Sequence, residues 1–242
     1  MSVVTPEWLD LREPADAAAR STDLADRLAR HLHGPLVIHD LGGGSGSMGR
    51  WLAPRLPGPQ HWVIHDRDPA LLALVEAPAE ARCSDISRLT ADDLAGASLV
   101  TASALLDLLT RDELARMLRA CRGLPMLLAL TVTGRVTLSP AEGLDARIGA
   151  AFNAHQRRDG RLGPDAVGAV LEEVDGEVLV RPSPWQLDDP DLIRAWFDGW
   201  VGAACEQDPA LEADAYLQRR LAQLAAGELG VTVDHADVLV LP

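Results

Sequence analysis

The sequence predicts an α/β fold built on a doubly wound, mostly parallel β-sheet. Short apolar runs rich in β-branched residues alternate with segments of helical periodicity, which is the pattern of successive βαβ units. Two of these runs, at 99–102 and 125–133, are almost continuously apolar, as expected of central strands that are covered on both faces. The 242 residues suffice for one medium-sized domain, and we expect a single domain over 1–242.

Residues 1–33 are predicted to form a helical segment. Thr5 is a suitable N-cap, and Pro6 occupies the first helical position after it. Leucines recur every four residues from Leu24 to Leu32, which predicts a helix over 16–32. The His-Gly-Pro sequence at 33–35 ends that helix.

Strands and helices then alternate along the chain. The predicted strands are 36–39, 60–65, 81–83, 99–102 and 125–133, and the predicted helices between them are 49–56, 70–76 and 110–121. After Gly134 the pattern changes, and residues 140–162 predict an amphipathic insertion that forms a small helical cap. The α/β pattern then resumes in the order helix 164–174, strand 177–181, helical region 189–226 and closing strand 231–242.

Charge and composition exclude several classes of function. Arginine supplies all 22 residues counted as Lys+Arg, against 36 Asp+Glu, and the net charge is −14. Such a field repels a phosphate backbone, so we expect neither a nucleic-acid partner nor an anionic membrane partner. The absence of lysine also excludes a Schiff-base lysine and the lysine of a P-loop.

Cysteine usage and the start of the chain predict a cytoplasmic protein. Cys83, Cys121 and Cys205 lie far apart without a C-x-x-C pair, which suits a reducing compartment and offers no zinc framework. The first residues lack an apolar leader, and no stretch approaches the roughly 18 apolar residues of a membrane span.

The segment VIHDLGGGSGSMG, residues 37–49, is the most informative part of the sequence. A strand runs into a glycine-rich turn and a helix begins behind it, so a ligand can approach the backbone closely at free helix N–H groups. Two registers fit. Gly44-x-Gly46-x-x-Gly49 matches the dinucleotide fingerprint, whereas Asp40-x-Gly42-x-Gly44-x-Gly46 puts a carboxylate at the end of the strand. The glycines alone leave both registers open.

Segments after the next three strands favour the second register. Asp66 ends the second strand about 20 residues beyond Gly46, the offset at which a carboxylate reaches ribose hydroxyls. Asp66-x-Asp68-Pro69, Ser84-Asp85-Ile86 and LVTASALLDL at 99–108 follow in order. Together with the glycine turn, these segments resemble the four motifs of class I S-adenosylmethionine-dependent methyltransferases of the small-molecule type. The resemblance covers 36–135 by motif and 164–242 by layout.

The resemblance implies a Rossmann-like methyltransferase fold with seven strands, the last one antiparallel. It also implies S-adenosylmethionine as cofactor and S-adenosylhomocysteine as product. By analogy with the family, Asp40 would orient the amino group, Asp66 the ribose and Asp85 the adenine. The further contacts that it implies come from Gly42, Gly44, Gly46, Ile86, Ser103 and Arg20. For Arg20, a helix-surface pair with Asp16 four residues earlier is the simpler interpretation.

The acceptor is expected to bind between the strand ends and the cap. His155 and Asp107 are the predicted catalytic residues, and Asn153, Gln156 and Trp185 are predicted to contact the substrate; for the three residues of the cap, a solvated helix face is the alternative. His39 and His65 are predicted to be packing residues, because strand alternation turns them away from Asp40 and Asp66. The carboxylates form no convincing metal cluster, so no metal is expected.

The expected reaction is methyl transfer to a small-molecule acceptor by in-line displacement. Two alternatives remain open at this point. One is a non-catalytic scaffold or regulator that binds S-adenosylmethionine, and the other is an enzyme that methylates protein side chains. The sequence does not indicate the oligomeric state or the methylated atom.

Overall fold

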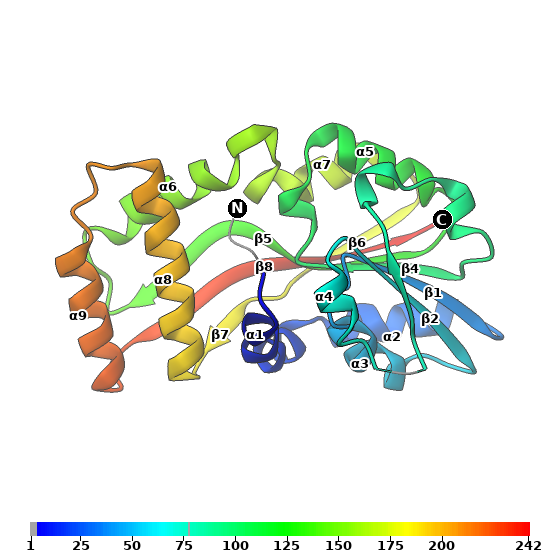
Figure 1. The fold of residues 1–242 in the computed structure, drawn as a ribbon, viewed down its shortest axis with the longest axis horizontal. Helices are drawn as coiled ribbons and strands as arrows, with labels where there is room; N and C mark the ends of the chain where they lie inside the picture. The colour runs from blue at the N-terminus through cyan, green and yellow to red at the C-terminus, as the bar shows by residue number, and fades with distance from the viewer. Residues whose placement is uncertain (1–3, 77) are drawn as a thin grey trace.

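The computed structural model describes residues 4–76 and 78–242 and contains a mixed β-sheet with helices on both faces (Figure 1). In chain order the strands are β1 (Leu36–Leu41), β2 (Gln60–Asp66), β3 (Glu80–Cys83), β4 (Leu99–Ser103), β5 (Met126–Ser139), β6 (Glu177–Pro182), β7 (Trp185–Leu187) and β8 (Gly230–Leu241). Their order in the sheet is β3-β2-β1-β4-β5-β8-β6, and β7 pairs with β8.

The first five strands are parallel, and β8 runs antiparallel to both of its neighbours, β5 and β6. The predicted fold class, a doubly wound and mostly parallel sheet with an antiparallel last strand, is therefore confirmed. Within the described residues, seven strands form the continuous order, and the short strand β7 pairs with β8 as an eighth.

Helices cover both faces of this sheet. They are α1 (Pro6–Ala19), α2 (Thr22–His31), α3 (Ser47–Leu52), α4 (Pro69–Leu72), α5 (Arg111–Ala120), α6 (Asp145–Gln156), α7 (Ala166–Glu173), α8 (Pro190–Gln207) and α9 (Asp214–Ala225). Figure 1 shows α5 and α7 on one side of the sheet and α1, α2 and α3 on the other. Two apolar cores correspond to these layers, one against α2, α3 and α8 and one against α5 and α7. Within the described residues, no helix combines the length and apolar character needed to cross a membrane.

The N-terminal segment contains two helices, so the prediction of one continuous helix over 16–32 was wrong. Thr5 caps α1 by accepting a hydrogen bond from the Trp8 N–H at 3.2 Å, as predicted. The chain then breaks at Arg20, whose backbone is extended, and Ser21 caps α2. Asp237 on β8 accepts a hydrogen bond from the Ser21 N–H at 2.7 Å. A residue more than two hundred positions away thus fixes the break.

Strand β5 is longer than predicted, because the sequence prediction ended it at Thr133 and the structure continues it to Ser139. Its first half is buried on both faces, whereas beyond Thr131 exposed and half-buried residues alternate. A strand with one solvated face loses the continuous apolar run that identified it. β5 pairs with β8 along this extension, with register shifts between Leu128 and Thr131 and between Val132 and Val136.

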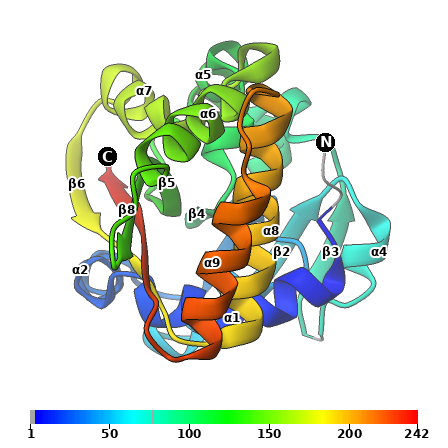
Figure 2. The same ribbon diagram turned by 90° about the vertical axis from the view of Figure 1, so that its left-hand side faces the viewer.

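Helices α6, α8 and α9 gather at this end of the sheet, as Figure 2 shows. Residues 140–162 contain α6, which packs against α8 and against the extended part of β5. Trp196 and Trp200, predicted core residues, are buried and stack with ring centroids 5.0 Å apart. Arg220 of α9 is fully buried and donates to Asp145 at the start of α6 at 2.5 Å. The extension of the sheet therefore has a helical layer of its own.

Candidate functional site

The glycine turn lies between β1 and α3, and its backbone conformation requires glycine. Gly42, Gly44 and Gly46 have φ values of +64°, +54° and +86°, which residues with a Cβ rarely adopt. A Cβ on Gly42 would lie 2.9 Å from Leu105 Cδ1, and one on Gly44 would lie 3.1 Å from Leu9 Cδ1. The turn is thus left-handed at all three glycines, and the ends of flexible side chains approach it closely at Gly42 and Gly44.

Asp40 lies beneath this turn at the end of β1. Its side chain is fully buried, and Oδ1 accepts a hydrogen bond from Thr101 Oγ1 at 2.7 Å. Oδ2 has no hydrogen-bond partner in the described part of the chain, and a Cβ on Gly43 would lie 2.5 Å from it. Burial raises the pKa of Asp40 to about 7, although the Thr101 hydrogen bond and the Arg20 charge oppose the shift. Asp40 is therefore a carboxyl group with one free oxygen directly under the turn.

Asp66 joins the end of β2 to the glycine turn. Oδ2 accepts from the Gly44 N–H at 2.9 Å, and Oδ1 accepts from the Asp68 N–H at the same distance. Asp68 in turn caps α4 by accepting from the Ala70 N–H. The side chain of Asp66 remains half-buried, so part of the carboxylate is open beside the turn. The structure thus places the predicted ribose ligand next to the predicted turn.

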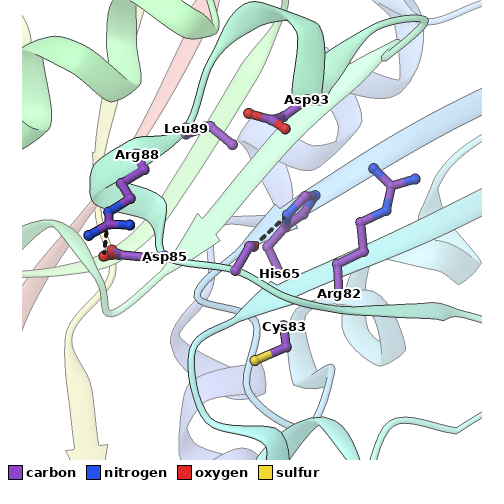
Figure 3. Close-up of a pocket in the computed structure, with 8 residues that line it drawn as sticks. His65, Arg82, Cys83, Asp85, Arg88, Leu89 and Asp93 are labelled. Carbon is purple, nitrogen blue, oxygen red and sulfur yellow. Dashed lines mark hydrogen bonds and ion pairs between the residues drawn. The ribbon is translucent and has the colours of Figure 1, made fainter.

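Asp85 and Ile86 follow β3, which lies beside β2 on the side away from β1. Asp85 is exposed and caps the short turn η2 (Ile86–Arg88) by accepting from the Ser87 N–H, and these hydrogen bonds lower its pKa. Ile86 Cδ1 would lie 3.5 Å from a Cβ on Gly42. Asp85 also lines a pocket of about 410 Å³, in which Figure 3 shows it beside Arg88.

A chain of polar groups on the sheet reaches the same pocket, which His65 and Ser84 line. His39 Nδ1 lies 2.9 Å from His65 Nε2, and His65 Nδ1 lies 3.0 Å from Ser84 Oγ. Burial, together with the neighbouring His39, lowers the pKa of His65 to about 4. Both histidines are buried, as expected of packing residues, and in addition they hydrogen-bond to each other. In Figure 3 the Cys83 side chain points away from His65.

Arg20, directly after α1, contacts the residues that follow the glycine turn and the end of β4. Its guanidinium donates to Ser47 Oγ at 3.3 Å and to Ser103 Oγ at 3.1 Å. Asp16 lies 3.9 Å away, so the helix-surface pair considered from the sequence exists but is buried. The Nε atom is buried without a hydrogen-bond partner among the described residues. The structure therefore brings together Arg20, Ser103 and the glycine turn, although they are far apart in the sequence.

Backbone strain occurs directly after β4 and within the first half of β5. Ala104 and Leu130 have φ values of +51° and +53°, in the left-handed region that residues with a Cβ avoid. Ala104 donates its N–H to the Ala129 carbonyl at 3.0 Å, and Leu130 donates to Asp237 Oδ1 at 2.8 Å. Such conformations persist where surrounding contacts enforce them, and they concentrate at functional sites.

Asp107 follows β4 in the turn η4 (Leu106–Leu108). It is buried, and its own backbone N–H and the Arg12 and Arg161 charges only partly oppose the effect of burial, which raises the pKa of Asp107 to about 6. No other side chain among residues 4–76 and 78–242 hydrogen-bonds to its carboxylate. The Leu162 N–H donates to the Leu109 carbonyl at 2.8 Å, which brings the end of the 140–162 segment beside η4. A carboxyl group without a side-chain partner thus lies at the predicted acceptor side.

Trp185 on β7 is buried against α1. Its Nε1–H donates to Asp16 Oδ1 at 3.0 Å, and the Arg12 guanidinium lies 4.9 Å from the centre of its ring. Arg12 also donates to Asp16 through Nε at 3.0 Å. The predicted substrate residue is therefore one wall of a polar cluster that includes α1.

The three predicted residues on α6 face different neighbours. His155 Nε2 lies 3.0 Å from Glu206 Oε2 on α8. Asn153 Nδ2 donates to the Gly134 carbonyl at 2.7 Å, and Gln156 Oε1 is buried without a hydrogen-bond partner among the described residues. None of the contacts recorded for these side chains in the described residues reaches Asp107 or the glycine turn.

Sequence reasoning missed Arg12 and His235. His235 on β8 is buried, and its ring centroid lies 5.1 Å from that of Trp185. The sequence contained a signal, because His235 and Asp237, two residues apart, put two polar side chains on the same face of β8. Arg12 gave no such signal, since an arginine on an amphipathic helix is ordinary. The described residues contain no group of three or more His, Cys, Asp or Glu side chains that could hold a metal ion.

The sequence matches no protein-family model and no curated protein. Solved structures are similar to it. A candidate type II methyltransferase from Anaeromyxobacter dehalogenans superposes with a TM-score of 0.59 at 15% identity, over 92% of this chain and 97% of the other. The chain has the class I methyltransferase fold.

Two further structures with the methyltransferase fold are similar to this chain. A candidate methyltransferase from an antibiotic biosynthesis pathway of Anabaena variabilis gives a TM-score of 0.54 at 12% identity, over 94% of this chain and all of the other (100%). The cyclopropane synthase MmaA2 of Mycobacterium tuberculosis gives 0.50 at 14% identity, over 98% and 94%. In this methyltransferase fold, the glycine turn, Asp66, Ser103 and Asp107 lie at the carboxyl ends of parallel strands, the edge where open α/β sheets bind ligands.

Proposed function

We propose that the protein is an enzyme that transfers a methyl group from S-adenosylmethionine to a small-molecule acceptor. The observation that carries the proposal is the glycine turn of left-handed Gly42, Gly44 and Gly46, with the Asp66 carboxylate bonded to the Gly44 N–H. The similarity of the fold to methyltransferases supports it. The net charge of −14 favours a small acceptor over a nucleic acid.

The residues around the turn fit the three parts of this cofactor. Asp66 and Asp85 would hold the ribose and the adenine, with Ile86 against the ring. Arg20, whose Nε is buried without a hydrogen-bond partner in the described residues, would bind the carboxylate beside Ser103, and Asp40 would support the amino group. Leu105 and Ile86 approach Gly42 only with the ends of flexible side chains, which can move aside for a ligand. When bound, S-adenosylmethionine supplies a methyl group on a sulfonium, a carbon already activated for displacement.

The protein's own contribution to the reaction is chiefly orientation of the two reactants, which can supply about 7–11 kcal/mol of the barrier. The acceptor would lie on the side of Asp107 and Trp185, where η4, β7 and α1 meet. Asp107 has no side-chain partner within the described residues, whereas His155 is engaged with Glu206. Of the two catalytic residues predicted from the sequence, Asp107 is therefore the better placed. Asn153 and Gln156 would line the far side of the acceptor.

Calorimetry on the purified protein tests the cofactor assignment. We expect S-adenosylmethionine and S-adenosylhomocysteine to bind in the micromolar range and NADH not to bind. Binding of NADH, or of none of the three, would contradict the proposal. Incubation with the low-molecular-weight fraction of a cell extract should then yield S-adenosylhomocysteine. Binding without turnover would favour the scaffold, and turnover with the protein fraction alone would favour protein methylation.

A further inference from the structure

The outer edge of strand β6 fits a second copy of this chain. β6 (Glu177–Pro182) is the last strand on its side of the sheet, so one row of its backbone N–H and C=O groups has no neighbouring strand among the described residues. We propose that β6 pairs antiparallel with β6 of a second copy, around a two-fold axis at Leu179, so that the two sheets become continuous. This inference is independent of the proposed function.

The helices beside β6 leave this edge open. α2 contacts β5 and β8 on one face of the sheet, and α7 contacts β5 on the opposite face. Figure 2 shows β6 at the outer margin of the molecule, with α7 on one side of it and α2 on the other. Helix α1, by contrast, contacts β7, the next strand along the same side of β8. On this side of the sheet, β6 is therefore the strand that a second copy can reach.

The hydrogen bonds to β8 define which residues of β6 face the open edge. Ser183, directly after the strand, donates its N–H to the His235 carbonyl at 2.9 Å, and the strand register places these two residues opposite each other. Hydrogen-bonded pairs alternate along an antiparallel ladder, so the odd-numbered residues of β6 bond to β8. The backbone groups of Val178 and Val180 consequently point outward. Pro182 also faces outward, and pairing ends there because proline has no N–H.

A two-fold axis at Leu179 uses these outward groups fully. Two antiparallel copies centred there place Val178 opposite Val180 of the partner subunit, and the N–H and C=O groups of the two valines form hydrogen-bonded pairs. Leu179 then lies opposite its own symmetry mate, in the closer type of pair without hydrogen bonds. An axis at Val180 would instead place Val178 opposite a proline, which cannot donate. The backbone therefore favours one register.

The same register brings opposite charges together. Glu177 lies opposite Arg181 of the partner subunit, and this pair occurs twice by symmetry. Within one chain, Arg27 of α2 lies 2.5 Å from Glu177, and Asp23 of α2 lies 2.8 Å from Arg181. Across the axis, the four side chains therefore alternate in sign, in the order Arg27, Glu177, Arg181 and Asp23. Opposite charges in directly opposed positions stabilise strand pairing, and like charges destabilise it.

Apolar side chains lie between these charges. Val178 and Val180 share the face that α7 covers, and Val180 is 37% exposed. Leu179 lies on the face of α2 and is half-buried. Between Glu177 and Arg181 the strand has no charge, proline or bulge, which are the usual means of preventing an edge strand from pairing. Pairing would cover the valines and leucines of both copies.

The opposite edge of the sheet is less suited to pairing. β3 (Glu80–Cys83) has only four residues, and Arg82 Nε donates to Glu80 Oε1 at 2.6 Å within the strand itself. A short, charged edge strand is protected from pairing. Contact between two β6 strands uses the same surface on both copies, so the assembly closes as a dimer.

Sedimentation velocity of the full chain over a range of concentrations tests the proposal. The measurement is made at physiological ionic strength, because two copies that each carry a net charge of −14 repel each other and salt screens this repulsion beyond about 8 Å. We expect a reversible equilibrium between monomer and dimer. A wild-type protein that remains monomeric at the highest concentration, or that forms larger species, would overturn the proposal.

Charge reversal tests the paired residues. Glu177→Arg and Arg181→Glu each put like charges opposite each other at two symmetry-related positions, so each should raise the dimer Kd about tenfold. An equimolar mixture of the two variants should regain the wild-type affinity, because every arginine then faces a glutamate. Glu80→Arg on β3 is the matched control and should dimerise like the wild type. Unchanged dimerisation in both single variants, or a mixture no tighter than its components, would overturn the proposal.

Cysteine cross-linking tests the register by a separate route. Cys83→Ser first removes the exposed native thiol, and this background should give no covalent dimer on oxidation. In this background Leu179→Cys places two thiols across the axis, with Cα atoms about 4.5 Å apart, which a disulfide can bridge. Val180→Cys places its two thiols on residues offset along the strands, beyond the reach of a disulfide. Oxidation should therefore give a covalent dimer with Leu179→Cys, and equal cross-linking of the two variants, or none with Leu179→Cys, would overturn the proposal.

Discussion

The two parts of the sheet present their polar side chains in different ways. In the parallel part, β3-β2-β1-β4, the residues of the candidate site lie at or just after the end of the strand that positions them. Asp66 is the last residue of β2, and Asp85 lies two residues after β3. In the extended part, β5 with β7 and β8, the polar cluster is assembled from distant elements. Asp16 comes from α1, Trp185 from β7 and His235 from β8.

This difference separates cofactor binding from acceptor binding. The conformation of the glycine turn is set by its own glycines, so the same local sequence is expected to form the same turn. A cluster assembled from three elements depends on register and on the bulges that aim the side chains. Substitutions in the extended part of the sheet can therefore alter acceptor binding without disturbing the glycine turn. Variants in the two parts should have separate effects on cofactor binding and on acceptor binding.

The largest effect is expected from Gly44→Arg, which should abolish S-adenosylmethionine binding. A Cβ at this position meets Leu9 at 3.1 Å, and the arginine side chain would fill the space beside the turn. The matched control is Gly34→Arg, where φ is +76° and a Cβ meets nothing within 4 Å. Both variants place a Cβ at a positive φ, which costs each of them about 1–2 kcal/mol. Calorimetry should show binding for Gly34→Arg alone, and equal affinities would refute the assignment of the turn.

The second comparison concerns two buried carboxyl groups, one from each part. Asp40 has a free oxygen beneath the glycine turn, whereas Asp237 accepts from Leu130 and Ser21 with both of its oxygens. Asp40 has a pKa of about 7 in the folded protein against 3.8 when unperturbed, so the folded state retains its proton between pH 4 and pH 7. The free energy of unfolding should accordingly fall as pH rises through this range, by about 4 kcal/mol.

Asp40→Asn should remove that pH dependence and stabilise the protein at pH 8. Asp237→Asn should instead destabilise it by about 1–3 kcal/mol, because its amide N–H group would face a backbone N–H donor. Urea unfolding of both variants at pH 5 and pH 8 distinguishes the two carboxyl groups. Shifts of the same sign in both variants would show that the contrast drawn between the two parts is wrong.

The sequence predicted those features of the structure that depend on residues close together in the chain. The alternation of strands and helices predicted the fold class, and the spacing of Asp66 from the glycines predicted a carboxylate for the ribose. The hydrogen bond between Asp66 and the Gly44 N–H was not predicted. The continuation of β5 past Gly134 was missed, since half-buried residues alternate there and resemble a surface loop. The position of Arg20 was considered, but its partners Ser47 and Ser103 depend on a helix break that Asp237 fixes from the far end of the chain. No local sequence pattern can indicate a contact between residues so far apart in the chain.

A smaller effect is expected from Asp66→Ala. Loss of the carboxylate removes the predicted ribose contact and the acceptor for the Gly44 N–H, so the Kd for S-adenosylmethionine should rise about tenfold. Asp68→Ala, which loses only the cap of α4, serves as the control. Calorimetry that gives the same Kd for both variants would show that Asp66 supports the turn without contacting the cofactor.

The smallest effect is expected from His155→Ala. Its Nε2 already lies 3.0 Å from Glu206 on α8. Glu206 is exposed and His155 half-buried, so loss of this pair should cost less than about 1 kcal/mol of stability. Turnover should fall by no more than about threefold, with the Kd for S-adenosylmethionine unchanged. Glu206→Ala should have the same effect, and the double variant should add nothing, because both changes break one contact. A loss of tenfold or more in His155→Ala alone would instead support the sequence prediction that this histidine is catalytic.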